Sequence, residues 1–357
     1  MQDDYLWDGS GEPDPEIRQL EAMLSKFRHC RPAANFAEGA PTTRQRAWPR
    51  ILRVQLAPAL AVAAAGLMVG AVWLAMRRAK SQLQSGWNVT CVVGSPRLGS
   101  EALRRGDKAG KLAVGQILET DNRSKATIAV GQLGEVEVDP DTRVRLIKAI
   151  SGEKRLALDR GTIRAAIWAP PGEFVVDTPS AVAVDLGCAY TLHVDDSGAG
   201  LLRTTLGWVG FKLGNRESFI PAGAVCATRP QIGPGTPYFE DASESFRAAI
   251  SKLDFGSLSP KQRSTELGIV LAHARRRDAL TLWHLLARTD GPERQHVYAR
   301  LAELAPPPAG VTREGILLLD PKMLDLWWNA LGYGNVALWR TFEGSWPRSA
   351  SGANPRP

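Results

Sequence analysis

An uninterrupted apolar stretch dominates the hydrophobic pattern of this chain. It covers Val54–Met76, contains no charged residue and has Gln55 as its one polar side chain. A helix rises ~1.5 Å per residue, so a run of this length can cross a ~30 Å hydrocarbon core. The run predicts a transmembrane helix over residues 54–76, and a long buried helix of a soluble domain is the alternative. Cations flank it on both sides, namely Arg44, Arg46, Arg50, Arg53, Arg77, Arg78 and Lys80.

A second apolar pattern, with helical spacing, precedes this run. Asp14, Pro15 and Glu16 are typical of a helix start, because they combine an N-cap acceptor, a fixed helical φ and a carboxylate at the positive end of the dipole. A helix this short needs a local core or a partner to cover its apolar stripe. The stripe consists of Ile17, Leu20, Leu24 and Phe27.

The leader ahead of this helix is acidic and contains the aromatic residues Tyr5 and Trp7. It is either a solvated tail or a docking element for a basic partner, in which the aromatic rings would serve as anchors. We expect residues 1–30 to form a helical arm and residues 31–53, which lack a sustained period, to form a linker. The candidate partner-binding residues of the arm are Tyr5, Trp7, Ile17, Leu20, Leu24 and Phe27.

Beyond the apolar run, residues 84–231 show short stretches of β type that recur about every ten residues. Turn sequences such as Asp139-Pro140-Asp141 and Gly214-Asn215 separate them, and a helical period is missing. This pattern predicts an all-β domain. It fits a sandwich and a flat-sided solenoid equally well.

From residue 238 to residue 346 the apolar spacing becomes helical. Short connections rich in Pro and Gly predict a small all-α module, followed by a disordered tail over residues 347–357. Trp327 and Trp328 are adjacent, so they cannot both face the same core, and one ring should be partly exposed or cover a neighbouring element. Core packing and a partner surface are both open for this pair. The predicted helices are Ser243–Leu253, Pro260–Arg275, Asp278–Arg288, Pro292–Leu304 and Pro321–Leu331.

Composition adds two points. The net charge is +7, but the cations that flank the apolar run account for it, so nucleic-acid binding is not expected. Cysteines are scarce and no CxxC spacing occurs. Cys188 and Cys226 follow turns of the β domain, and they are either bridged to each other or buried as free thiols.

Candidate chemistry is sparse. His193 lies near Asp195 and Asp196, but the following Ser197-Gly198 makes this stretch a strand that runs into a turn. A nucleophile motif, a phosphate loop and a two-histidine metal helix are all missing from the sequence. We therefore expect no enzymatic activity, no cofactor and no metal.

A series of short motifs in the β domain resembles the FecR domain. That family contains membrane-tethered regulators of extracytoplasmic-function sigma factors, each with a cytoplasmic segment, one transmembrane helix and a periplasmic β domain. The motif residues have structural interpretations, because glycines let strands turn and prolines fix φ beside sheet edges. The series comprises Thr142-Arg143-Val144, Leu156-Ala157-Leu158, Arg160-Gly161, Phe174–Pro179, Asp185-Leu186-Gly187, Gly207-Trp208-Val209 and Ile220–Gly223.

The resemblance implies a single-pass protein of the bacterial inner membrane, with the N-terminus cytoplasmic and the C-terminal domains periplasmic. It implies a regulator that relays a periplasmic signal to a cytoplasmic sigma factor, with a further envelope protein as a candidate partner. The alternative is a membrane-anchored envelope scaffold or binding protein without sigma-factor activity. The sequence thus predicts a helical arm, a transmembrane helix, an all-β FecR-like domain and an all-α module, in that order.

Overall fold

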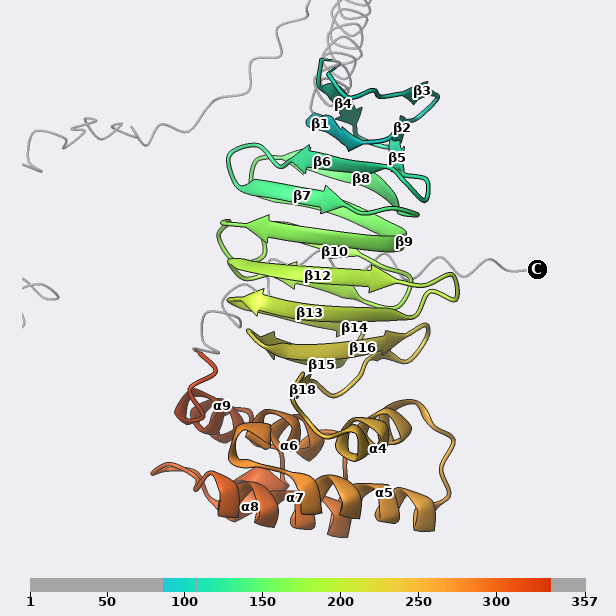
Figure 1. Ribbon diagram of the computed structural model, residues 1–357. Helices are drawn as coiled ribbons and strands as arrows, with labels where there is room; N and C mark the ends of the chain where they lie inside the picture. Colours follow the sequence, from blue (N-terminus) through green and yellow to red (C-terminus); the bar gives the residue numbers. More distant parts are fainter. Residues whose placement is uncertain (1–85, 107, 335–357) are drawn as a thin grey trace, which may run out of the picture. The chain divides into compact units, whose positions relative to one another are not determined.

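The computed structural model of the protein describes residues 86–106 and 108–334 (Figure 1). These residues form a mostly β structure with a C-terminal helical region. This corrects the predicted fold class of a single-pass membrane protein, because no helix among the described residues is long and apolar enough to cross a bilayer. The run 54–76 on which that prediction rested, the arm 1–30, the linker 31–53 and the tail 347–357 all lie outside the described residues.

Two sheets lie one behind the other and share a single hydrophobic core (Figure 1). Sheet A has the strand order β4-β1-β6-β7-β9-β12-β13-β16, and the short strands β17 (Gly233–Pro234) and β18 (Tyr238–Phe239) pair with β16. Apart from β9, its strands are β1 (Gly86–Val93), β4 (Gly110–Ala113), β6 (Lys125–Ala129), β7 (Gly134–Val138), β12 (Cys188–Val194), β13 (Gly200–Leu206) and β16 (Ala224–Arg229). Sheet B has the strand order β3-β2-β5-β8-β9-β10-β11-β14-β15. Apart from β9, its strands are β2 (Arg97–Leu98), β3 (Glu101–Ala102), β5 (Ile117–Glu119), β8 (Arg143–Ile150), β10 (Phe174–Asp177), β11 (Val182–Asp185), β14 (Trp208–Leu213) and β15 (Arg216–Pro221).

The strand β9 (Glu153–Ile167) belongs to both sheets. Its first half pairs with β8 and β10 in sheet B, and its second half pairs with β7 and β12 in sheet A. The change of sheet occurs at Gly161, which has a φ of +92° and would place a Cβ 2.3 Å from the Oγ1 of Thr142. A side chain at this position would collide with Asp141 and Thr142, which lead into β8, so the crossing requires glycine.

This arrangement is a sandwich and not a solenoid. Consecutive strands form antiparallel hairpins that alternate between the sheets, and β9 with β10 is the parallel pair among the described strands. Alternation of inward and outward side chains along strands of sheet A builds much of the core. In β12, for example, Tyr190, Leu192 and Val194 point inward and are buried, while the residues between them face outward.

The helical region follows β18 at one end of the sandwich (Figure 1). The helix α6 is at its centre, because every one of its residues is buried. The neighbouring helices begin at side-chain caps such as Ser243, Ser259 and Asp320. The helices are α4 (Glu244–Phe255), α5 (Pro260–His273), η1 (Arg276–Asp278), α6 (Ala279–Leu286), α7 (Gly291–Leu304), α8 (Arg313–Leu317) and α9 (Pro321–Ala330).

A buried arginine ties these helices to the sandwich. Arg288, just after α6, forms an ion pair with Asp254 of α4 at 3.3 Å. It also donates hydrogen bonds to the Oγ of Ser218 at 2.7 Å and to the carbonyl of Glu217 at 2.9 Å, both in β15. Asp254 pairs in turn with Arg216 at 2.8 Å. We call Arg216, Asp254 and Arg288 the junction cluster. Since its charges are paired and hydrogen-bonded, they can remain buried where the two parts meet.

Trp327 and Trp328 are both buried, so of the two alternatives predicted for this pair, partial exposure does not hold and coverage of a neighbouring element does. Trp327 is 0% exposed, and its Nε1 donates to the carbonyl of Ala305 at 3.2 Å. Trp328 is 2% exposed, with its ring centroid 4.8 Å from that of Trp283 and 5.5 Å from that of Phe219. The two rings leave α9 in different directions, and separate neighbours cover each of them. They are core residues and not a partner surface.

We expect Trp328→Ala to lower the free energy of unfolding by about 3–5 kcal/mol, because it removes a large ring from the contact between α6, α9 and β15. The matched control is Leu326→Ala in the same helix, where the side chain is 47% exposed and the change should stay within about 0.5 kcal/mol. Denaturant unfolding of both variants measures the difference. Equal stabilities for the two variants would contradict the packing described here.

Candidate functional site

The two cysteines considered for a disulfide are free and buried. The Sγ of Cys188 donates to the Oδ2 of Asp185 at 2.7 Å, and the Sγ of Cys226 donates to the carbonyl of Gly235 at 3.2 Å. Burial raises the pKa of both thiols, that of Cys226 to about 12, so neither is a reactive thiolate. Of the two alternatives for this pair, a disulfide bridge and buried free thiols, the structure has the free thiols.

A buried carboxyl group lies beside Cys188. The Oδ1 of Asp185 accepts a hydrogen bond from the backbone N–H of Gly187 at 2.7 Å, which closes the turn between β11 and β12. Burial raises the pKa of Asp185 to about 7. Tyr190 and Thr204 are paired across β12 and β13, and within the described part of the chain their buried hydroxyls have no hydrogen-bond partner. Solvent does not reach these groups, so the cluster belongs to the core.

A second titratable group is buried at the helical junction. His284 of α6 accepts a hydrogen bond from the backbone N–H of Phe219 at its Nε2, 3.0 Å away, and its Nδ1 lies 2.8 Å from the carbonyl of Leu280. Burial lowers the pKa of His284 to about 3, and the nearby charge of Arg288 adds to this effect. The ring is therefore neutral and connects α6 to β15. Its role is structural.

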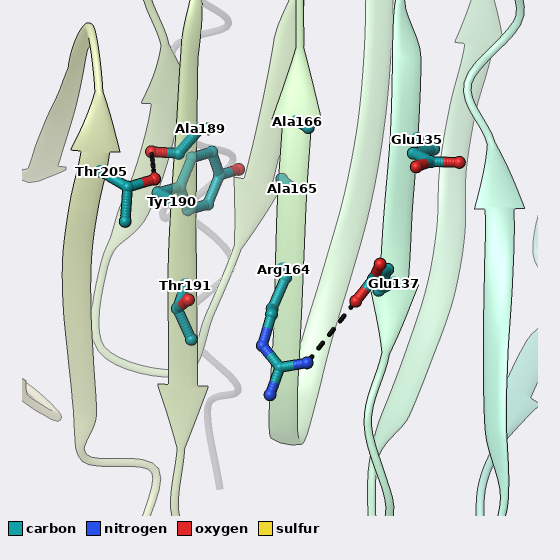
Figure 2. Close-up of a pocket in the computed structure, with 9 residues that line it drawn as sticks. All are labelled: Glu135, Glu137, Arg164, Ala165, Ala166, Ala189, Tyr190, Thr191 and Thr205. Atoms are coloured by element: carbon teal, nitrogen blue, oxygen red, sulfur yellow. Dashed lines mark hydrogen bonds and ion pairs between the residues drawn. The ribbon is translucent and has the colours of Figure 1, made fainter.

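An accessible hollow lies on the outer face of sheet A (Figure 2). It has a volume of about 230 Å³. Its charged part is a group of ion pairs around Arg164, whose guanidinium lies 3.5 Å from the Oε2 of Glu137 and 2.8 Å from the Oδ2 of Asp139. The hydroxyl of Thr205 donates to the carbonyl of Ala189 at 2.9 Å. The lining residues come from β7, β9, β12 and β13, and they are Glu135, Glu137, Arg164, Ala165, Ala166, Ala189, Tyr190, Thr191 and Thr205.

A second hollow of about 370 Å³ continues the first. The two share Glu135 and Ala166, so they are adjacent depressions on the same face, and we call them together the furrow. Trp168 forms part of its second half and is 63% exposed. An exposed indole of this kind is uncommon, because aromatic rings normally bury their large apolar area. The second hollow is lined by Ala129, Gly131, Gln132, Gly134, Glu135, Ala166 and Trp168.

The furrow is suited to binding. It combines three alanines, an exposed ring and polar groups that include Glu135, and such a mixture of apolar and polar groups is usual in a recognition site. Among the described residues, no group of three or more His, Cys, Asp or Glu side chains could hold a metal ion.

The residues predicted as partner-binding do not meet at the furrow. Tyr5, Trp7, Ile17, Leu20, Leu24 and Phe27 lie outside the described residues. Trp327 and Trp328 are buried in the helical region. Sequence reasoning missed the furrow because its floor depends on which outward positions are neighbours across the strands, and the pairing register supplies that information.

Comparisons with known proteins give a distant likeness in structure. No protein-family model matches the sequence, so membership of the FecR family is not shown. A search of curated proteins also finds no match. Two crystal structures of a candidate anti-sigma factor from Parabacteroides distasonis are similar to 37% of this chain, with 13% and 14% sequence identity and a TM-score of 0.32 in both cases. The chain spans 63% and 62% of that protein, which is less than two thirds of its length. At these values the likeness supports neither a fold nor a function.

We expect Asp185 to make stability depend on pH. Its pKa is higher in the folded chain than its ordinary 3.8, so the folded state binds the additional proton between about pH 3.8 and about pH 7. The contribution of this carboxyl to the free energy of unfolding therefore falls as pH rises through that window, by up to about 4 kcal/mol at roughly 1.4 kcal/mol per pH unit.

Denaturant unfolding of the wild type and of Asp185→Asn over this pH range measures the effect. The stability difference, wild type minus variant, should decrease as pH rises. The lowered pKa of His284 has the opposite sign, since its contribution is lost as pH falls from 6.5 to about 3. It is the same in both proteins and cancels in the difference. Parallel pH profiles would show that Asp185 keeps an ordinary pKa.

Proposed function

We propose that this chain is a regulator of the anti-sigma type, in which the arm 1–30 binds a sigma factor and the body of residues 86–334 receives an input. The supporting observation is that the FecR-like motifs coincide with positions on which the sandwich depends. Gly161 lies where β9 changes sheets, and a Cβ at Gly207 would lie 2.2 Å from the carbonyl oxygen of Gly187. Both glycines have positive φ, as does Gly187.

The crossing of β9, the Asp185 turn and the close approach of Gly187 and Gly207 are places where the fold needs a glycine or a turn residue, and the motif series has one at each of them. This agreement is the support that the structure lends to the proposal. The expected location is the bacterial inner membrane, with the N-terminus cytoplasmic and the C-terminal domains periplasmic. It stays a prediction, since no described residue tests it.

The furrow favours a second candidate function. A body that carries an open recognition surface can serve as a binding protein by itself, without sigma-factor activity. The two functions differ in the arm, because the first requires it to hold a partner and the second does not.

The test of the first function is capture of a purified sigma factor by the full chain, compared with a Leu20→Asp, Leu24→Asp variant. If the apolar stripe of the arm is buried in the complex, each carboxylate should weaken binding at least about tenfold, equivalent to about 1.4 kcal/mol. The matched control is Leu318→Asp, where a side chain that is 76% exposed in the helical region receives the same charge. It should bind like the wild type.

Candidate sigma factors are those recovered with the full chain from its own cells and then produced separately. Equal binding by the wild type and the double variant would reject the assignment of the arm. Failure of the full chain to bind any of them would reject the first function and leave the second.

A further inference from the structure

We propose that the furrow on sheet A is a binding site for a linear glycan of neutral or amino sugars. This inference is separate from the sigma-factor proposal, because it concerns the described body and not the arm. It rests on the geometry of the floor, on the groups that line it and on the direction in which it runs.

The floor is a row of residues that follows the pairing register across the strands. Ala129 faces Glu135, Glu135 faces Ala166, and Ala166 faces Ala189. The row extends to exposed Asn88 on β1 and to exposed Leu206 on β13. Neighbouring strands are about 4.8 Å apart, so a row that crosses β1, β6, β7, β9, β12 and β13 is about 24 Å long.

The furrow is bounded by larger side chains on both sides. The neighbouring outward row contains the Glu137–Arg164 ion pair and Thr191, and it rises on one side of the alanines (Figure 2). Trp168 lies two residues beyond Ala166 on the other side, beside the β6–β7 turn. Gly131 in that turn and Gly134 at the start of β7 have no side chains that could cover the indole, which is 63% exposed. Ala129, Ala166 and Ala189 therefore lie between a charged row and an exposed ring, and Glu135 projects from the same row between Ala129 and Ala166.

The lining groups match the two kinds of surface that a sugar ring presents. Pyranose rings present an apolar C–H face, which stacks on an aromatic ring, and hydroxyls at their edges, which need hydrogen-bond acceptors and donors. Trp168 supplies the ring. Glu135 supplies a carboxylate that has no hydrogen bond or ion pair to another residue of the described structure, and Gln132 adds an amide in the same hollow.

The net charge of the lining argues against anionic polymers. Glu135, Glu137 and Arg164 give one excess negative charge, since Arg164 is the one cation among the lining residues of the two hollows. Nucleic acids and acidic polysaccharides would meet this carboxylate without a compensating cation. A neutral glycan avoids that cost, and an amino sugar would pair with Glu135.

The direction of the furrow argues against an extended peptide. The furrow runs across the strands on the face of the sheet, where the backbone N–H and C=O groups are already used in the pairing of the strands. Peptides that dock on β structure normally use a free sheet edge, where their own backbone groups find partners. On this face a peptide would depend on side chains alone. A glycan needs no backbone partner, so it fits the furrow better.

Calorimetric titration of the purified full chain tests the proposal. The probes are soluble cello-, xylo-, manno- and chito-oligosaccharides long enough to span the furrow. At least one of them should bind the wild type, with a Kd on the order of micromolar to millimolar. Trp168→Ala should weaken that binding at least about tenfold, whereas Trp168→Phe, which keeps a ring, should retain most of it.

Two further variants separate the furrow from general surface effects. Ala166→Gln places a longer side chain on the outward-facing floor and should abolish binding while the unfolding transition stays unchanged. Leu318→Ala removes a side chain that is 76% exposed in the helical region and should bind the glycan like the wild type. The Leu20→Asp, Leu24→Asp variant should also bind the glycan normally, so failure of the sigma-factor proposal and failure of this one give different results.

Three outcomes would overturn the proposal. The first is that no oligosaccharide of the panel binds the wild type. The second is that one binds but Trp168→Ala and Ala166→Gln bind it equally well, which would place the glycan elsewhere. The third is that an extended peptide selected on the wild type binds, loses affinity with Trp168→Ala, and is not displaced by any glycan. The furrow would then be a peptide site.

Discussion

The membership of β9 in both sheets is the constraint on which the rest of the sandwich depends. Its first half aligns β8 and β10 in sheet B, and its second half aligns β7 and β12 in sheet A. The register of each sheet is therefore set relative to the other by one continuous strand. The furrow inherits this constraint, because Ala166 at the centre of its floor lies on the same strand, five residues after the glycine at which β9 changes sheets.

The helical region depends on a different interaction, the burial of paired charges in the junction cluster. Arg288 contacts Asp254 of α4 and the backbone and hydroxyl groups of β15. Because leaving either charge unpaired in this environment would be costly, the helices have one favourable position on the sandwich. The neutral ring of His284 and the rings of Phe219, Trp283 and Trp328, which meet in edge-to-face and tilted arrangements, fill the apolar part of the same contact. The helices and the sandwich thus share one core, and the aromatic residues there have a structural role.

The type of secondary structure could be predicted from the sequence for most of the described residues, and its assembly could not. Alternation and turn residues indicate the strands, and three- and four-residue spacing indicates helices close to α4, α5, α6, α7 and α9. The short α8 has less than two turns of apolar spacing and was missed. Spacing alone could not choose between a sandwich and a solenoid, because both repeat strands at similar intervals. That choice depends on which strands pair and on the antiparallel direction of the pairs, and no periodicity reveals either.

The positions of the candidate sites could not be predicted from the sequence either, because they depend on how the elements pack. Adjacent tryptophans suggest that one ring is partly exposed or covers a neighbouring element. The second alternative holds because β15, α6 and α7 are placed around α9, and the sequence does not show that placement. The furrow is hidden in the sequence because alanines in separate strands carry no signal until the register aligns them. The apolar run predicted a single-pass membrane protein, but no helix among the described residues is long and apolar enough to cross a bilayer. The apolar run itself and the arm 1–30 lie outside the described residues.

The two ends of the sandwich differ in how their edge strands are protected. At one end, β16 is followed by β17, β18 and the helices, so strand pairing ends against packed structure. At the other end, β4 pairs only with β1 within the described residues, and its outer edge is the four-residue segment Gly110–Ala113. Short edge strands that carry lysine are poor templates for pairing with another chain, and Lys111 lies in the middle of this one. Among the described strands of sheet A, addition of a strand from another copy is therefore left to β4, and the brevity and charge of that edge disfavour it.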